Sequence, residues 1–338
     1  MKILILGGTG VISRAIVERL LEQNHEVILF NRGKRNVPFS RDVRVIVGDR
    51  FAEDGLEQAL GKETFDVVID MICFNPKDAE ITLRVFAERA GHIIVTSSIA
   101  AYKRPYHTLP TREDAEELLD KPLFPYAFNK AEMERYIWAE VEKRKLPVTV
   151  IRPSLTYGVG AANIGVLRQN YGILYRIRNG KPLVMFGDGS TPWQFTFVED
   201  LAKAYAGVVG NPKAFGQAYH ATTDEIHRWE DLYLEFGKIV GKEPRIVHVP
   251  SELLMQAAPE LCSHLYFEKT FPGVFDNGKI RTVVPDYKAE VSLHEGLARI
   301  AEWFDREAAE VDPLKDKLED QIVSFYEEFA GKMKDLML

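Results

Sequence analysis

The chain has 338 residues, of which 46% are hydrophobic, 28% charged and 11% aromatic. This is ordinary globular composition, so wholesale disorder is excluded, and the length allows one large domain or two of average size. The formal net charge of −7 disfavours nucleic acid as a partner, because proteins that bind the phosphate backbone usually carry a basic surplus.

The first half of the chain alternates strand-like and helix-like segments. Short apolar runs are typical of buried strands, and apolar residues that recur every three or four positions are typical of helices. The predicted strands span residues 2–6, 26–30, 43–47, 66–71, 92–95 and 148–151, and the predicted helices span 11–21, 51–60, 76–90 and 125–143. Near-continuous apolar strands separated by helices indicate an α/β fold with a doubly wound parallel sheet, covered on both faces.

The second half is richer in loops and aromatic residues, and we interpret it as a smaller α+β region. It contains predicted strands at 183–186, 218–221 and 246–249 and predicted helices at 163–179, 198–209, 229–240 and 293–309. We expect a first domain over 1–155, to which 181–210 return, a second region over 156–310, and a helical tail over 311–338. Apolar residues at 322, 325, 329 and 333 form a stripe on the tail, which we expect to pack against the body or a partner subunit.

A glycine-rich turn joins the first predicted strand to the first predicted helix. Gly7 and Gly8 permit positive φ angles, and Gly10 lets a pyrophosphate approach the backbone. The following helix offers unpaired N–H groups and the positive end of its dipole to such an anion. The pattern favours a dinucleotide-binding domain over 1–155, with a glycine turn that binds no ligand as the alternative. The residues expected to contact the cofactor here are Gly7, Gly10, Val11 and Ile12.

The end of the second predicted strand bears on the choice of dinucleotide. Sites that prefer NAD usually place a carboxylate there to bind the ribose hydroxyls, whereas this chain has Asn31 followed by Arg32. An amide and a guanidinium accept a 2′-phosphate that a carboxylate would repel, so we expect NADP slightly ahead of NAD, with a solvated basic loop as the alternative. Asp49, after the third strand, is placed either to accept a hydrogen bond from the adenine amino group or to cap its own loop.

Three polar residues are candidates for the chemistry. Tyr126 and Lys130 are four residues apart on the long predicted helix, so their side chains share one face. A tyrosine acts as an acid or base near neutral pH only if its pKa falls from about 10, and a neighbouring ammonium favours the phenolate. Ser98 follows the fifth strand, at the edge where ligands bind in open parallel sheets, and can hydrogen-bond a substrate hydroxyl or carbonyl.

With these motifs the chain resembles the extended short-chain dehydrogenase/reductase family, the group of NAD(P)-dependent sugar epimerases and dehydratases, over about residues 1–310. The segments that carry the resemblance are 7–10, 49, 96–98, 126–130, 152–158, 187–189, 197–200 and 291–297. The resemblance implies a Rossmann domain with Tyr126 as acid/base, Lys130 on the nicotinamide ribose and Ser98 positioning the reacting group. It also implies a homodimer formed through the helices 76–90 and 125–143. The further cofactor contacts expected are Arg50, Thr96 and Pro153.

Departures from the family pattern narrow the expected function. Family 4,6-dehydratases carry an Asp-Glu pair after the catalytic serine or threonine, whereas Ile99 and Ala100 stand here and cannot transfer protons, so dehydration by that route is disfavoured. Where many nucleotide-sugar members have an arginine that clamps the substrate diphosphate, this chain has Trp193, which binds by stacking and cannot neutralise phosphate. The arginines that could replace this clamp are Arg168, Arg176 and Arg178.

Segments 31–33, 48–50 and 193–195 resemble an atypical branch of the family, which includes uncharacterised epimerase-like proteins and chloroplast RNA-binding relatives. The acidic net charge opposes RNA, so nucleic acid is not the expected partner. Tyr157 could flank the substrate, with core packing as the favoured alternative. The histidines show no metal-ligand spacing, Cys73 and Cys262 lie far apart, and no apolar run approaches ~20 residues. We therefore expect no metal, no disulfide, no membrane span and a cytoplasmic location.

We predict an enzyme that oxidises a sugar-like secondary alcohol, with or without a nucleotide, by hydride transfer to NAD(P)+ with Tyr126 as the base. Reduction of the keto intermediate from the other face would then give an epimer, a step that the resemblance alone implies. Two alternatives remain: a net reductase or dehydrogenase with an exchangeable NADP, and a catalytically idle RNA-binding or regulatory protein.

Overall fold

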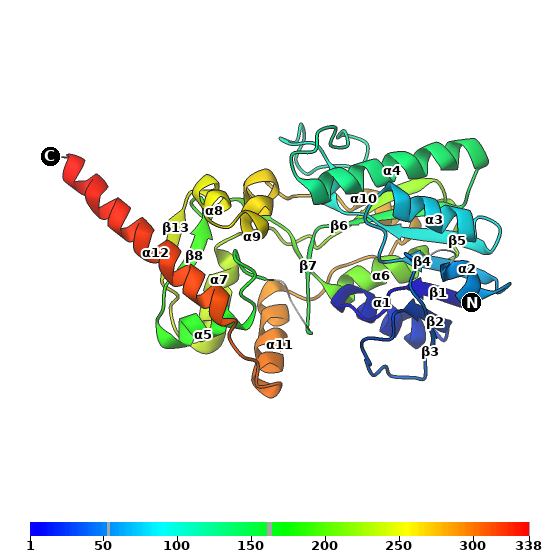
Figure 1. The fold of residues 1–338 in the computed structure, drawn as a ribbon, viewed down its shortest axis with the longest axis horizontal. Coiled ribbons are helices and arrows are strands. Elements are labelled where there is room, and N and C mark those ends of the chain that lie inside the picture. Colours follow the sequence, from blue (N-terminus) through cyan, green and yellow to red (C-terminus); the bar gives the residue numbers. More distant parts are fainter. Residues whose placement is uncertain (53–54, 161–163, 338) are drawn as a thin grey trace. The chain divides into compact units, whose positions relative to one another are not determined.

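The structure, a computed structural model, describes residues 1–52, 55–160 and 164–337 and divides the chain into two compact units (Figure 1). The first unit consists of Met1–Thr156, Thr196–Asp224 and Phe275–Glu290, and the second of Tyr157–Phe195, Glu225–Val274 and Val291–Leu338. The expectation was that 181–210 return to the first unit. In the structure the returning segment begins at Thr196, because 183–186 form a strand that pairs within the second unit.

A sheet of seven parallel strands forms the centre of the first unit, which confirms the expected α/β fold class. The strands are β1 (Lys2–Leu6), β2 (Glu26–Asn31), β3 (Arg44–Val47), β4 (Phe65–Asp70), β5 (Ala90–Thr96), β6 (Val148–Pro153) and β11 (Gln217–Ala221). Their order in the sheet is β11-β6-β5-β4-β1-β2-β3. The chain winds outward from β1 in one direction and from β4 in the other. The carboxyl ends of β1 and β4 therefore form the switch point at which ligands bind in open sheets.

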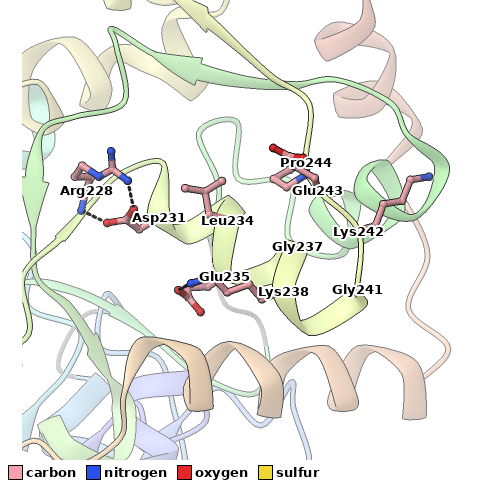
Figure 2. Close-up of a pocket in the computed structure, with 10 residues that line it drawn as sticks. All are labelled: Arg228, Asp231, Leu234, Glu235, Gly237, Lys238, Gly241, Lys242, Glu243 and Pro244. Carbon is pink, nitrogen blue, oxygen red and sulfur yellow. Dashed lines mark hydrogen bonds and ion pairs between the residues drawn. The ribbon is translucent and has the colours of Figure 1, made fainter.

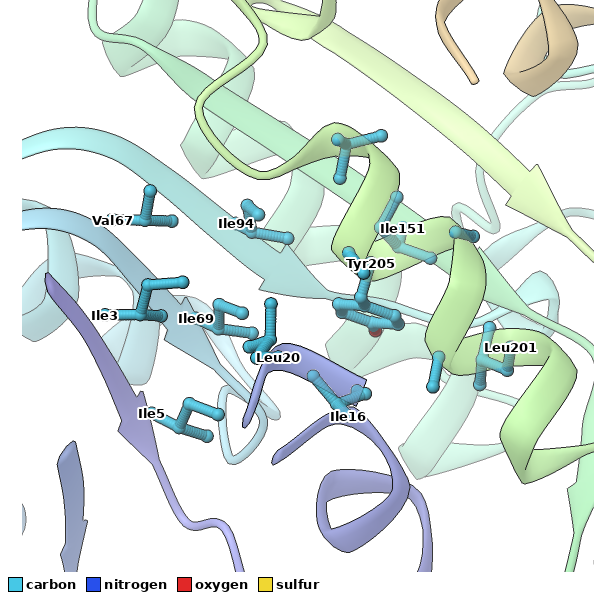
Figure 3. Packing of buried hydrophobic residues seen from close by; sticks show 14 of the residues in the cluster. Ile3, Ile5, Ile16, Leu20, Val67, Ile69, Ile94, Ile151, Leu201 and Tyr205 are labelled. Atoms are coloured by element: carbon cyan, nitrogen blue, oxygen red, sulfur yellow. The ribbon is translucent and has the colours of Figure 1, made fainter. Parts of the chain in front are cut away.

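Helices cover both faces of this sheet because successive strand residues point to opposite sides. The helices of the first unit are α1 (Val11–Glu22), α2 (Gly55–Leu60), α3 (Pro76–Phe86), α4 (Pro125–Arg144), α6 (Val198–Val208) and α10 (Gly278–Val283). Ile3 and Ile5 of β1 belong to the buried cluster that includes residues of α1, α6 and α10 (Figure 3), whereas Leu4 and Leu6 belong to the cluster with α2, α3 and α4. Helix α3 ends earlier than predicted because β5 already begins at Ala90.

The second unit contains helices and short strands. Its helices are α5 (Tyr171–Asn179), α7 (Asp231–Val240), α8 (Ser251–Ala257), α9 (Pro259–His264), α11 (Leu293–Arg306) and α12 (Pro313–Lys334). Strands β8 (Leu183–Phe186) and β13 (Ile246–Val249) pair in parallel, and β9 (Pro192–Trp193) pairs antiparallel with β12 (His227–Arg228). The predicted helix over 163–179 begins only at Tyr171, because Arg168 and Asn170 adopt positive φ angles of 52° and 53° that interrupt it. Residue 163 lies outside the described part.

The C-terminal tail is the long helix α12, and its first half is fixed to the second unit by charged side chains. The buried Arg176 of α5 donates hydrogen bonds to the carboxylates of Asp316 and Asp320, and Lys181 pairs with the same two residues. Of the predicted apolar stripe, Ile322 is buried. In the part of the chain that the structure describes, no helix is long and apolar enough to cross a membrane.

Candidate active site

The carboxyl ends of four neighbouring strands in the first unit border a cleft of about 540 Å³. The residues that line it follow β1, β2, β3 and β4, which meet at this edge because the strands are parallel. The volume lies in the range of ordinary cofactor and ligand pockets. The lining residues are Gly7, Thr9, Phe30, Asn31, Arg32, Lys34, Arg35, Gly48, Asp49, Arg50, Phe51, Ile72 and Phe74.

The glycine turn has the geometry of an anion-binding loop. Gly7 and Gly8 have φ angles of 107° and 93°, and a Cβ on Gly8 would lie 2.6 Å from the Leu29 side chain, so only glycine fits. Helix α1 starts directly after Gly10, and no hydrogen bond to the backbone N–H of Val11 or Ile12 is present among the described residues. These donors at a helix N-terminus suit a phosphate, and they belong to two of the residues expected to contact the cofactor.

Three cations stand on the β2 side of the cleft. Arg32, Lys34 and Arg35 line it, and within residues 1–52, 55–160 and 164–337 none of the three forms an ion pair. Asn31 also lines the cleft, and its amide fixes the turn. Its Oδ1 accepts from the Gly33 N–H at 2.8 Å and its Nδ2 donates to the Gly7 carbonyl at 3.3 Å.

Two further predicted cofactor residues are held by the protein itself. The Asp49 carboxylate accepts a hydrogen bond from the Phe51 N–H at 3.0 Å, so it caps its own loop, as one of the two expectations had it. Asp49 also lines the cleft. The Arg50 side chain is buried, and its guanidinium donates to both carboxylate oxygens of Asp70 at 3.0 Å and to Thr82 Oγ1 at 2.8 Å. Arg50 thereby ties the carboxyl end of β4 to α3 and forms part of the cleft wall.

Lys130 of α4 reaches the carboxyl ends of β4 and β5. Its ammonium donates to the carbonyl of Cys73 at 2.6 Å and to that of Thr96 at 2.7 Å, and it lies 4.8 Å from the centre of the Phe74 ring. The side chain is 2% exposed. Burial lowers the pKa of Lys130 from its usual 10.5 to about 8. The group is thus a buried cation with one ammonium hydrogen beyond the two that these carbonyls accept.

Tyr126 and Ser98 are the other two residues that the sequence predicts for the chemistry. Tyr126 lies in the first turn of α4, one turn before Lys130, and is 42% exposed. Burial, with a smaller contribution from the nearby Tyr126, raises the pKa of Tyr205, whose hydroxyl is 2.8 Å from Thr96 Oγ1. Ser98 follows β5 by two residues, and its Oγ accepts from the Ala100 N–H at 3.1 Å, which leaves its O–H free to donate elsewhere. Ser98 therefore follows β5 closely, and Tyr126 lies one turn before Lys130, whose ammonium is hydrogen-bonded to the end of β5.

A buried polar network beneath this corner was not predicted. Glu134 lies one turn after Lys130 on α4, and its carboxylate accepts from the Ser97 hydroxyl and from Arg152 Nε at 2.9 Å. Arg152 also donates to the Tyr102 hydroxyl at 2.6 Å, which in turn lies 2.7 Å from His220 Nε2. The network holds the segment that carries Ser98 against β6 and α4. Pro153, the remaining expected cofactor residue, ends β6 and is buried.

The residues expected to bind substrate in the second unit are enclosed there. Trp193 is fully buried, with Lys269 Nζ 4.4 Å from the ring centre, the Trp229 ring at 5.8 Å, and Gly273 so close that a Cβ would overlap the indole. Tyr157 is buried as well. Stacking on Trp193 would require this packing to open. Of the three arginines considered as a diphosphate clamp, Arg176 and Arg178 are already paired with carboxylates, and Arg168 is exposed.

A second pocket of about 490 Å³ lies over α7 and the loop that follows it (Figure 2). Arg228 pairs there with Asp231, and Lys238 with Glu235, while Lys242 donates to the Arg178 carbonyl at 3.0 Å. Because these charges are satisfied by their neighbours, we place the chemistry at the cleft of the first unit.

Comparisons with known proteins identify the family and agree with the fold. The model of the "NAD dependent epimerase/dehydratase family" matches residues 3–221. The chain is 27% identical to 2′-dehydrokanamycin reductase of Streptomyces kanamyceticus, over 91% of this chain and 85% of that protein. It is 28% identical to the chloroplast stem-loop binding protein of 41 kDa b of Arabidopsis thaliana, over 73% of this chain and 65% of that protein. A UDP-glucuronic acid 4-epimerase structure from Bacillus cereus, with UDP-glucuronic acid and NAD bound, has a TM-score of 0.71 at 19% identity. The match covers 91% of this chain and 100% of that chain, and it shows that the two proteins share a fold.

Proposed function

Because the chain belongs to the NAD-dependent epimerase/dehydratase family, we propose that it transfers hydride between a nicotinamide dinucleotide and a secondary alcohol of a sugar-like substrate. Tyr126 is the acid/base, Lys130 binds the nicotinamide ribose and supports the phenolate, and Ser98 orients the reacting oxygen. The observation that carries the proposal is the Lys130 ammonium, buried at the ends of β4 and β5 with Tyr126 one turn away on the same helix.

The residues of the first-unit cleft fit such a dinucleotide. The free N–H groups of Val11 and Ile12 suit its pyrophosphate. Because Gly8 packs too closely on Leu29 to carry a side chain, no side chain at this position of the turn blocks the pyrophosphate. The exposed rings of Phe51 and Phe74 offer apolar surface for its heterocycles. When bound, the nicotinamide ring accepts or donates the hydride. Residues of the chain hold the substrate oxygen and accept or donate its proton.

The proton moves through Tyr126 in this proposal. On oxidation the phenolate accepts the proton of the substrate hydroxyl, which Ser98 holds by donating a hydrogen bond to the same oxygen. The positive charge of Lys130 favours the phenolate over the phenol, so that Tyr126 serves as a base near neutral pH. Glu134 and Arg152 are positioning residues, since Glu134 accepts a hydrogen bond from Ser97 and Arg152 holds Glu134, and neither is proposed to contact the reacting groups.

The role of Lys130 predicts an alkaline limb in the pH dependence of kcat/KM, which reports groups of the free enzyme. Because burial lowers the pKa of Lys130 to about 8, the ammonium is present below that pH and is lost above it. We expect kcat/KM to fall as the pH rises through about 8. In Lys130→Arg, whose guanidinium stays charged, the limb should move to higher pH. A limb at the same pH in both proteins would assign it to another group.

We further propose that NADP(H) is preferred to NAD(H), since Arg32, Lys34 and Arg35 offer three cations to a 2′-phosphate. Arg32→Ala should weaken binding of NADP(H) about tenfold, roughly the 1.4 kcal/mol of one charge-assisted hydrogen bond, and leave NAD(H) almost unchanged. Calorimetric titration of both dinucleotides measures the ratio. Arg41→Ala is the matched control, because Arg41 is exposed and bonded to Asn24. Equal losses for the two dinucleotides would defeat the 2′-phosphate assignment.

The net reaction is epimerisation if the keto intermediate stays bound and receives the hydride on its other face. Net reduction of a carbonyl substrate is the second candidate, favoured by the three cations and by the similarity to 2′-dehydrokanamycin reductase. Absorbance at 340 nm separates the two, because an epimerase retains its cofactor without net change while a reductase consumes NADPH stoichiometrically. Mass spectrometry of molecules that co-purify with the chain would identify the cofactor and the substrate class.

RNA binding, suggested by the stem-loop binding relative, is less well supported, because the net charge is −7. A salt-dependent shift of RNA that Tyr126→Phe leaves unchanged, in a protein without turnover, would favour that function over catalysis.

A further inference from the structure

A pocket of about 780 Å³ lies in the second unit at the carboxyl ends of the paired strands β8 and β13. Its wall consists of the turn that follows β8, the segment from the end of β13 into α8, and one tyrosine each from the turn after α9 and from α12. The volume is that of a small-molecule site. None of the residues assigned above to the cofactor or to hydride transfer lines it, so a ligand here would bind at a site of its own.

Two carboxylates line the pocket with oxygen atoms left to accept hydrogen bonds. Asp188 Oδ1 accepts from the Ser190 N–H at 3.1 Å and from the Ser190 hydroxyl at 2.7 Å. These bonds lower the pKa of Asp188, so the carboxylate is charged at neutral pH, and they fix its direction. Its Oδ2 receives no hydrogen bond from any residue that the structure describes, and Glu252 forms no ion pair with any of those residues.

Two tyrosine rings form the aromatic part of the lining. Tyr266 is 38% exposed and Tyr326 is half-buried, and neither hydroxyl takes part in a hydrogen bond within the described part of the chain. The face of such a ring attracts an ammonium group and offers apolar surface to the carbon skeleton of a ligand. The hydroxyls can each donate and accept further hydrogen bonds. The pocket thus combines aromatic surface with negative charge.

The composition of the lining excludes two common kinds of ligand. No lysine or arginine is among the described residues that line the pocket, so a phosphate would meet like charge. Of these lining residues only His248 is basic, and its Nε2 lies 3.4 Å from Glu230 Oε2, which balances any positive charge that the imidazole gains. A metal ion does not fit either, because no three His, Cys, Asp or Glu side chains in the described structure are close enough together to hold one.

We propose that this pocket binds an organic amine in its ammonium form. The ammonium donates a charge-assisted hydrogen bond to Asp188 Oδ2, Glu252 adds longer-range attraction, and the carbon skeleton packs against the two tyrosine rings. Amino sugars and linear polyamines share this chemistry, and the volume accommodates either. The proposal is independent of the proposed hydride transfer, because the pocket shares no lining residue with the cleft of the first unit.

Calorimetric titration of the full chain with glucosamine, glucose and spermidine, at physiological ionic strength, tests the proposal. Glucosamine and glucose form a matched pair, because they differ only in an amine against a hydroxyl group. At a pH low enough to protonate that amine, we expect both amines to bind and glucose to bind about tenfold more weakly than glucosamine. The factor corresponds to the loss of one hydrogen bond between charged groups.

Substitutions in the lining locate the binding. Asp188→Asn should weaken the affinity for both amines about tenfold, because it removes the charge and keeps the size of the side chain. Tyr326→Leu should weaken it about threefold through the lost ring face. The matched controls are Asp286→Asn, at an exposed carboxylate of the first unit, and Phe325→Leu, at an exposed ring next to Tyr326 that does not line the pocket. Both should leave the affinities unchanged.

Binding of one amine without the other supports the site and decides between an amino sugar and a linear polyamine as its ligand. Glucose that binds as tightly as glucosamine would show that the ammonium is not recognised and would overturn the proposal. So would amine binding that neither Asp188→Asn nor Tyr326→Leu weakens, or the absence of binding of either amine at millimolar concentrations. An equal loss in Asp286→Asn and Asp188→Asn would reduce the binding to general attraction by the net charge of −7 and would overturn it as well.

Discussion

Replacing Tyr126 by phenylalanine is expected to lower kcat by about 10²–10⁴-fold, the usual contribution of a positioned acid/base, while cofactor affinity is retained. The substitution removes only a hydroxyl and keeps the ring, which lies 6.1 Å from that of Phe124. The groups proposed to hold the dinucleotide, at the glycine turn and on the β2 side of the cleft, are untouched. Steady-state kinetics gives the first quantity, and fluorescence titration with NADPH gives the second.

Tyr136→Phe is the control for this experiment, because the half-buried Tyr136 lies on the same helix, ten residues further on. It should leave both quantities unchanged. Turnover near the wild-type rate in Tyr126→Phe would remove the phenol from the mechanism. A parallel loss of turnover and of cofactor affinity would give Tyr126 a structural role instead.

The largest expected loss of stability follows removal of Arg152. Arg152→Met leaves the fully buried Glu134 carboxylate without the guanidinium that neutralises it, and should lower the free energy of unfolding by about 3–5 kcal/mol. The double variant Arg152→Met/Glu134→Leu should lose much less, because neither charge is then buried alone. Denaturant unfolding of the wild type, both single variants and the double variant completes the cycle.

If the losses of unfolding free energy in the two single variants simply add in the double variant, Arg152 and Glu134 are not coupled. That result would contradict the proposal that their ion pair holds the segment carrying Ser98 in place. A second readout connects the network to function. Glu134→Gln keeps the size of the side chain and should raise KM or lower kcat through Ser97. Because the Glu134 charge raises the pKa of Lys130, the alkaline limb assigned to Lys130 should also move to lower pH.

Most of the central sheet could be predicted because strands such as β1, β2 and β6 are apolar and buried, whereas the edge strand β3 is largely exposed. The run at 2–6 matches β1, and the runs at 26–30 and 148–151 fall within β2 and β6. In the second unit, the runs at 183–186 and 246–249 match the paired strands β8 and β13. The start of α5 could not be predicted, because Arg168 and Asn170 adopt left-handed conformations that no local pattern in the sequence indicates. Strands of two or three residues, such as β9 and β12, depend on pairing between distant segments.

At the site, the glycine turn and the shared face of Tyr126 and Lys130 could be predicted, because both depend only on residues that are close in sequence. The burial of Glu134 was not predicted, because a glutamate on a long helix usually faces solvent. Its position four residues after Lys130, on the same face of the helix, was the signal that could have indicated it. Arg50 illustrates the converse. The family resemblance implies a cofactor contact for Arg50, which lines the cleft, but nothing in the sequence indicated that Asp70, twenty residues later, pairs with its guanidinium.

The most direct test of the account is a crystal structure of the chain with NADP+ bound. We expect the pyrophosphate against the N–H groups of Val11 and Ile12, the 2′-phosphate beside Arg32, and the nicotinamide ribose within hydrogen-bond reach of Lys130 Nζ and the Tyr126 hydroxyl. A dinucleotide bound elsewhere, or a crystal at saturating NADP+ in which this cleft stays empty, would contradict the proposed enzyme.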